Sequence, residues 1–279
     1  MTHILLLFVS AITLMLNVLI FSKNRACQLH ALLETYRRFV TGDVNLRVLG
    51  LATSAEFRRG YAILEERFDG TLLAREHDFR SDVFRLLSPS RPYTMFAVDD
   101  QIFRRPVDLN AACRVLEDAR VLCVSLRLSP DITRCYMSDT DTTPPHFESG
   151  VGEALLYPWR DYAGDWGYPM SQDTTIFRTA DLLPLLHRLS WNNPTESEGE
   201  MSRHPLPHPL MACYNEAAAM NVPANLVQQW SPGNRTCGGP PAKELNQRYL
   251  DGDVIDVEPM LKLRPNTCHV PTVYTFRRY

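Results

Sequence analysis

Along the first half of the chain, short continuous apolar runs alternate with segments in which apolar residues recur at helical spacing. Short apolar, β-favouring runs predict buried strands at 17–21, 46–51, 93–98 and 121–128. Between them, apolar residues recur at helical spacing and predict helices near 29–39, 57–68, 78–87 and 109–119. This order predicts an α/β fold with a mainly parallel central sheet flanked by helices.

The second half has weaker periodicity and is richer in proline, which indicates an irregular carboxyl-terminal part. Residues 129–166 predict a long functional loop with short strands, and Asp181–Leu189 predicts a short helix. Asn193, Pro194 and Glu196 predict the start of another helix, because they supply a cap, a first residue and a capping-box partner. No linker divides the chain clearly, so we expect one domain over residues 17–279.

The amino terminus allows two interpretations. Residues 4–21 are largely apolar, and as one segment of about 18 residues they approach the minimum length of a membrane-spanning helix. Because the sheet needs a strand at 17–21, we favour dividing this segment between that strand and an apolar leader, which is residues 1–16. This leader is either a membrane anchor through residues 4–16 or an extension from an early start codon. We expect a cytoplasmic protein, and membrane association stays open.

Charge and cysteine content exclude some classes of protein. Lys and Arg number 29 against 32 Asp and Glu, a net charge of -3, which argues against a nucleic-acid-binding protein. Seven cysteines without a C-x-x-C pair fit reduced thiols better than a disulfide framework or a zinc finger.

The sharpest chemical signal is the pair Asp99 and Asp100, which ends the apolar run at 93–98. Two neighbouring carboxylates repel each other, and a divalent cation would offset that repulsion. Carboxylates of this kind suit Mg²⁺ or Mn²⁺, with substrate phosphates completing the shell. The alternative is a pair of solvated turn residues that cap a helix.

A second signal is the polar turn 22–25, which lies between the first strand and the first helix. Free backbone N–H groups at a helix start favour anions, so this turn suits a nucleotide base, ribose or diphosphate. The alternative is an ordinary solvated loop. Ligands of parallel sheets bind at the carboxyl ends of the strands, so residues 22–25, 53–56 and 99–101 are expected to cluster.

The order of these segments resembles bacterial glycosyltransferases of the GT-A fold. More narrowly, it is similar to uncharacterised glycosyltransferase-like proteins with FSK-x-R-x-x-QL near the start, DD-x-IF in the middle, and DWGYP and NP-x-x-x-E later. The corresponding segments here are Phe21–Leu29, Asp99–Phe103, Asp165–Pro169 and Asn193–Glu198. The resemblance covers residues 17–270.

The resemblance implies a GT-A-like enzyme that moves a sugar from a nucleotide-sugar donor to a glycan or other hydroxyl acceptor, with Mn²⁺ or Mg²⁺. It implies roles in polysaccharide biosynthesis. Its donor-binding residues would be Phe21, Ser22, Arg25, Gln28 and Asp99, and its metal ligands Asp99, Asp100 and His269. Gln101 follows the acidic pair where a strict Asp-x-Asp would have a second acid, so metal dependence is open.

A carboxylate would take the proton of the acceptor hydroxyl. The candidates are Asp173, Glu198 and Asp165, and also Glu196, which fits a capping box better. Two other functions remain open: a non-catalytic, membrane-associated binding protein on the same fold, and a glycoside hydrolase, which needs two separated carboxylates.

Overall fold

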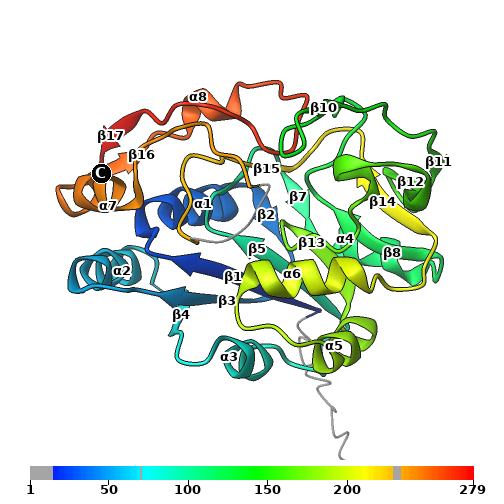
Figure 1. Cartoon of the computed structure of the whole chain (residues 1–279), viewed down its shortest axis with the longest axis horizontal. Helices are drawn as coiled ribbons and strands as arrows, with labels where there is room; N and C mark the ends of the chain where they lie inside the picture. Colours follow the sequence, from blue (N-terminus) through cyan, green and yellow to red (C-terminus); the bar gives the residue numbers. More distant parts are fainter. Residues whose placement is uncertain (1–14, 70, 229–233) are drawn as a thin grey trace, which may run out of the picture.

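The computed structural model describes residues 15–69, 71–228 and 234–279. Within these ranges the largest sheet has nine strands in the order β11-β12-β14-β8-β13-β5-β1-β3-β4 (Figure 1). In chain order these are β1 Leu16–Lys23, β3 Val44–Leu51, β4 Leu72–Arg75, β5 Tyr93–Val98, β8 Val121–Ser125, β11 Glu148–Ser149, β12 Ala154–Pro158, β13 Thr175–Arg178 and β14 Leu210–Tyr214. The strands expected at 17–21, 46–51, 93–98 and 121–128 are therefore confirmed as β1, β3, β5 and β8.

The sheet is mainly parallel. The four strands β4, β3, β1 and β5 are parallel neighbours, and β8 is parallel to β14. Strand β13 runs antiparallel between β5 and β8, and β12 runs antiparallel between β14 and β11. Among the described strands of this sheet, only β12 and β13 oppose the common direction, so the expected α/β fold class is confirmed.

Helices cover both faces of the sheet. They are α1 Ala26–Phe39, α2 Ala55–Arg67, α3 Phe79–Leu86, α4 Leu109–Arg114, α5 Thr179–Arg188, α6 Pro194–Arg203, α7 Ala242–Leu250 and α8 Glu258–Leu261. In Figure 1, α1, α7 and α8 lie above the sheet and α3 and α5 below it. The helix expected at 109–119 ends earlier, at Arg114, and continues as a 3₁₀ turn over Val115–Glu117.

The alternation of side chains along β1 explains these layers. Val18 and Ile20 belong to one hydrophobic core, with Leu29 and Leu32 of α1. Leu19 and Phe21 point to the opposite face and belong to a second core. A strand that is buried on both faces carries a continuous apolar sequence, which is why β1 is visible in the amino-acid pattern.

In the described ranges, short strand pairs also form outside the large sheet. They are β2 Val40–Thr41 with β7 Val107–Asp108, β6 Gln101–Phe103 with β15 Ala219–Asn221, β9 Arg134–Cys135 with β10 Thr140–Asp141, and β16 Asp253–Ile255 with β17 Phe276–Arg278. The pairing of β6 with β15 matters most for the site, because it places Asn221 opposite Gln101, next to the acidic pair.

The expected leader falls almost entirely on residues 1–14, which lie outside the described residues. Leu16, its last residue, belongs to β1 and is fully buried. Across the described ranges, no helix has both the length and the apolar character that crossing a bilayer requires.

Candidate functional site

One edge of the sheet collects the polar residues that the sequence singled out. Strands β1 and β5 end there, at Lys23 and Val98. Because β13 runs the opposite way, it begins at this edge, where Thr175 pairs with Phe96 of β5 and Ser125 of β8. The acid before β13, Asp173, therefore lies at the same edge as the acidic pair after β5. The strand order brings together residues that are more than 70 positions apart.

Arg25 joins the first turn to the acidic pair. Its Nη1 lies 2.9 Å from Oδ1 of Asp99 and 3.3 Å from Oδ2 of Asp100. The other oxygen of Asp99 accepts the backbone N–H of Lys23 at 3.1 Å. Burial opposes a charged guanidinium, but the two carboxylates outweigh it and raise the pKa of Arg25 above its ordinary value. The expected meeting of the first turn with Asp99 and Asp100 is thus present in the structure.

Arg25 also holds a distant segment against this turn. Its Nε donates to the side-chain oxygen of Asn225 at 3.0 Å, and its Nη2 donates to the Asn225 carbonyl. Asn225 in turn donates to the carbonyl of Pro240. Arg25 is 7% exposed. Its hydrogen bonds therefore couple the acidic pair to the segment after β15.

Asp100 carries negative charge that its surroundings compensate incompletely. Burial raises the pKa of Asp100 to about 6; Arg25 opposes this shift, and the carboxylates of Asp99 and Asp173 reinforce it. Its Oδ1 accepts a hydrogen bond from the side-chain amide of Asn221 at 3.0 Å. An additional cation near Asp100 would relieve the repulsion among these three acids.

Asp173 lies in a more positive environment than Asp100. Arg127 Nη1 lies 3.1 Å from Oδ2 of Asp173, and Nε2 of His269 lies 3.6 Å from the same oxygen. The Asn221 amide donates to its Oδ1 at 3.2 Å. Burial would raise the pKa of Asp173, but the Arg127 charge and the bonds from His269 and Asn221 outweigh it and lower this pKa to about 2. Asp173 is therefore a fixed anion at neutral pH.

Glu198 has the opposite electrostatic character, although it belongs to the same cluster. One of its oxygens accepts the backbone N–H of Gln172 at 2.7 Å, and the other accepts the Tyr168 hydroxyl at 3.0 Å. Burial and the nearby Asp173 charge raise the pKa of Glu198 to about 7, although the Gln172 N–H and Arg127 oppose the shift. At neutral pH, Glu198 can accept and release a proton.

The helix start that carries Glu198 is built as the sequence predicts. Asn193 accepts the N–H of Glu196 at 2.9 Å, and the Glu196 carboxylate accepts the N–H of Asn192 at 2.8 Å. Glu196 thus supports the helix start as predicted, although its carboxylate bonds the residue before the cap and not the cap residue itself. It also fixes the first turn of α6, and so the direction in which Glu198 points.

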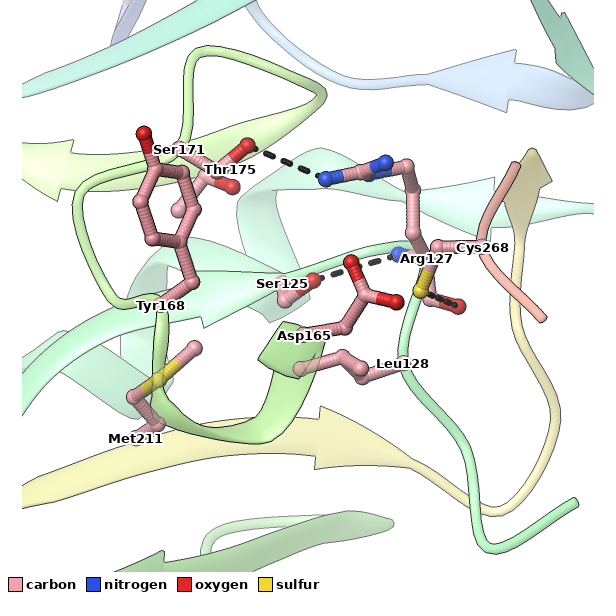
Figure 2. Close-up of a pocket in the computed structure, with 9 residues that line it drawn as sticks. All are labelled: Ser125, Arg127, Leu128, Asp165, Tyr168, Ser171, Thr175, Met211 and Cys268. Atoms are coloured by element: carbon pink, nitrogen blue, oxygen red, sulfur yellow. Dashed lines mark hydrogen bonds between the residues drawn. The ribbon is translucent and has the colours of Figure 1, made fainter. Parts of the chain in front are cut away.

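Arg127 and Asp165 line a small cavity beside these acids (Figure 2). Figure 2 shows Arg127 extending toward Ser171, to which it donates at 3.0 Å. Oδ2 of Asp165 is buried and has no hydrogen-bond partner among the described residues. The cavity has a volume of about 10 Å³, roughly the space of one water molecule. Tyr168 also lines it and is 37% exposed.

A larger cavity lies on the other side of the first turn. It measures about 140 Å³ and lies between α2 and the ends of β3 and β4. Its wall includes Tyr61, whose hydroxyl is 2.7 Å from that of Ser22 and accepts the N–H of Arg25 at 3.3 Å. Ser22 therefore links the acidic edge to a space large enough for a small organic ring.

Phe21, one of the expected donor-binding residues, points away from the acidic edge. The ring of Phe21 packs in the core against Phe79 and Phe96, and only its backbone carbonyl reaches the site, where it accepts the Asp99 N–H. Gln28 is 1% exposed, and its two amide atoms have no partner among the described residues. Their donor-binding roles stay predictions.

Two central residues were not identified from the sequence, Arg127 and Asn221. Both had a local signal, since each is a polar residue inside an apolar run, at 121–128 and 217–224. A buried charge or amide in such a run needs a partner. The sequence does not say which partner, because the partners come from other strands.

The residues fit a divalent cation only with help from other ligands. In the described part of the chain, no group of three or more His, Cys, Asp or Glu side chains could hold a metal ion. Both oxygens of Asp99 and both oxygens of Asp100 accept hydrogen bonds. Asp100 is the better candidate of the pair because its contact with Arg25 is longer, 3.3 Å against 2.9 Å. Nδ1 of His269 is buried without a hydrogen-bond partner among the described residues, and its ring faces the acids. Asp100 and His269 would thus share a cation with phosphate oxygens.

Sequence comparison identifies a curated relative. The chain is similar to the bifunctional glycosyltransferase pgtA of Dictyostelium discoideum, with 25% identity over 186 residues. The similarity is therefore to part of a glycosyltransferase. The match covers 60% of it but only 24% of the relative, so the chain spans about a quarter of that protein's length. No family model matches the chain.

Two solved structures show a distant similarity. TarS from S. aureus (residues 1–349, in complex with UDP-GlcNAc) superposes with a TM-score of 0.48 and 12% identity, over 73% of this chain and 57% of that one. A mannosyltransferase from Pyrobaculum calidifontis, in complex with GDP-Man and Mn²⁺, superposes with a TM-score of 0.39 and 12% identity, over 73% and 56% of the two chains.

Proposed function

We propose that the protein is a glycosyltransferase that moves a sugar from a nucleotide-sugar donor to a hydroxyl acceptor, assisted by a divalent cation. One observation carries this proposal: a single network holds two kinds of acid. Asp100 lies in the turn after β5, and its negative charge is compensated only in part. Glu198 has a pKa of about 7. The similarity to a curated glycosyltransferase supports it.

The donor would bind at the first turn. The 140 Å³ cavity beside Tyr61 would take the base of the nucleotide, and the diphosphate would lie toward the start of α1, where the helix dipole favours an anion. Ser22 would orient the part of the donor in the cavity, and Arg25 would orient the diphosphate. A cation shared by Asp100 and the diphosphate would stabilise the negative charge that gathers on the leaving group.

The acceptor would approach from the side of α6. Glu198 would take the proton from the acceptor hydroxyl, because a pKa near the working pH suits a general base. The acceptor oxygen would form the new bond to the sugar, and the bond to the diphosphate would break with its electron pair on the leaving phosphate. Asp173 would remain ionised and hold Arg127 and His269 in place.

Calorimetric titration with UDP- and GDP-linked sugars tests the proposal. We expect binding that strengthens with Mn²⁺ and weakens with EDTA, together with release of the nucleoside diphosphate. Asp100→Asn should weaken the cation-dependent part about 10-fold or more, since it removes the charged ligand. The matched control is Asp141→Asn, whose side chain is 88% exposed in a surface ion pair.

Each outcome has a distinct meaning. Absence of binding for every common donor, with and without Mn²⁺, would refute the glycosyltransferase proposal. Binding of a nucleotide without turnover would favour the non-catalytic binding protein instead. Equal affinities for Asp100→Asn and Asp141→Asn would remove Asp100 from the cation site and leave the rest of the proposal standing.

A further inference from the structure

Asn221 occupies the centre of the acidic network. It is 2% exposed and ends β15. Its side-chain NH₂ group donates to Oδ1 of Asp100 at 3.0 Å and to Oδ1 of Asp173 at 3.2 Å. Its side-chain oxygen accepts from Arg127 Nη1 at 3.0 Å and from Gln101 Nε2 at 3.3 Å. An Asn side chain has two donors and two acceptor sites, and here all four are used.

These four partners fix the orientation of the amide. In the flipped orientation, the oxygen would face two carboxylates and the NH₂ group would face an arginine and another amide donor, so every contact would be repulsive. The backbone is fixed as well. The N–H of Asn221 donates to Cys268, and its carbonyl accepts the N–H of Val270, which places the segment carrying His269 alongside.

The amide of Asn221 holds Asp100 and Asp173 together better than a charged side chain would. A carboxylate at this position would repel Asp100 and Asp173. A lysine or arginine would hold both acids but neutralise the charge that attracts a cation to Asp100. A neutral double donor keeps the two acids at a set separation without cancelling that charge.

We propose that Asn221 is a positioning residue for sugar transfer. By bridging Asp100 and Asp173, it aligns the diphosphate of the donor with the side of the site that carries Glu198, the proposed general base. This inference rests on the proposed function. It assigns to Asn221 no contact with substrate. Its loss should therefore lower turnover much more than it weakens donor binding.

Asn221→Ser tests this role, because a serine hydroxyl donates one hydrogen bond and cannot bridge both acids. We expect kcat for release of UDP or GDP from the sugar donor to fall 10- to 100-fold, as expected when reacting groups lose alignment. KM for the donor should change by less than about 3-fold. The matched control is Asn17→Ser. Asn17 is equally buried and donates to Ser88 and Thr94 at the start of β1.

The control separates positioning from stability. Both variants should lower the melting temperature, and only Asn221→Ser should lower kcat when both are assayed well below that temperature. Asn221→Gln, which keeps the two donors on a longer arm, should recover part of the loss. Equal effects of Asn221→Ser and Asn17→Ser on kcat would overturn the proposal.

A second measurement needs no activity. Double-mutant cycles on the unfolding free energy pair Asn221→Ser with Asp100→Asn, with Asp173→Asn and with Asp165→Asn. If Asn221 bridges Asp100 and Asp173, the losses of unfolding free energy should be non-additive for the first two pairs and additive for the third. Additivity in all three would overturn the bridge. If the wild-type protein binds no nucleotide sugar, the proposed function fails, while these cycles still decide whether Asn221 couples the two acids.

Discussion

The guanidinium of Arg127 and the carboxylate of Asp173 form a buried ion pair, 3.1 Å apart and only 6% and 13% exposed. Arg127 follows β8, and Asp173 precedes the strand that lies beside it. The pair places a stable anion at the edge of the sheet, and this anion in turn raises the pKa of Glu198. The ion pair therefore contributes both to the fold and to the electrostatics of the site.

Removing Arg127 should destabilise the protein strongly. Arg127→Met leaves Asp173 buried without its cation, which typically costs about 3–5 kcal/mol of unfolding free energy. Urea denaturation measures this loss. The double variant Arg127→Met with Asp173→Asn should regain most of the stability, because the uncompensated charge is gone. If the double variant is as unstable as the single one, the ion pair is not the cause.

Turnover should fall as the pH drops below about 7, because Glu198 must be ionised to accept a proton and its pKa is about 7. Glu198→Gln should abolish this limb of the pH profile and lower kcat about 100-fold or more, the usual contribution of a general base. The control is Glu200→Gln on the same helix, where Glu200 pairs with Arg203 on the surface. A Glu198→Gln enzyme that keeps the wild-type profile would point to another base.

A cation bound at Asp100, as proposed, would compete with Arg25, which already contacts both carboxylates of the acidic pair. Arg25→Met should lower stability by about 3–5 kcal/mol, as for other broken buried pairs. Addition of Mn²⁺ should then raise the melting temperature more in this variant than in the wild type. The control Arg38→Met breaks an exposed pair with Glu258, which should matter little. A smaller Mn²⁺ effect in Arg25→Met than in the wild type would contradict the competition.

The cap of α6 should affect activity through Glu198. Asn193→Ala removes the hydrogen bond to Glu196 and should cost about 1 kcal/mol of stability. Because the first turn of α6 also positions the base, kcat should fall several-fold. Asp108 caps α4 by accepting the N–H of Asn110 and serves as the control. Asp108→Ala should lower stability and leave kcat unchanged; a parallel fall in both variants would indicate a general folding defect.

Part of the parallel sheet was predictable because its strands are buried on both faces. Strands β1 and β5 carry nearly continuous apolar residues, and β3 is apolar from Val48 onward, after Asn45 and Arg47; the ends of all three were placed within two residues. Strands β4, β13 and β14 were missed because each has only four or five residues. The reversed direction of β13 depends on pairing partners far away in the chain, which a local pattern does not show.

The sequence singled out the acids of the candidate site but only some of their partners. Asp99, Asp100, Asp173 and Glu198 stood out as acids at turns or helix starts, and Arg25 and His269 were singled out as well. Arg127 and Asn221 were not, because Arg127 contacts Asp173 across 46 positions and Asn221 contacts Asp100 across 121. Local patterns carry no information on such distances. Arg127 and Asn221 became visible only when the sheet order was known.

The reversed strand β13 has a consequence for how such a protein could diversify. The wall proposed to face the nucleotide is encoded mostly before residue 104, whereas the wall that carries Glu198 is encoded between β8 and the end of α6. A recombination event confined to the later stretch would replace Asp173 and Glu198 together and leave β1, α1 and the turn between them unchanged. The two walls could then vary separately, provided that the exchanged stretch again supplies an arginine at position 127 to contact Asn221, which lies outside both stretches.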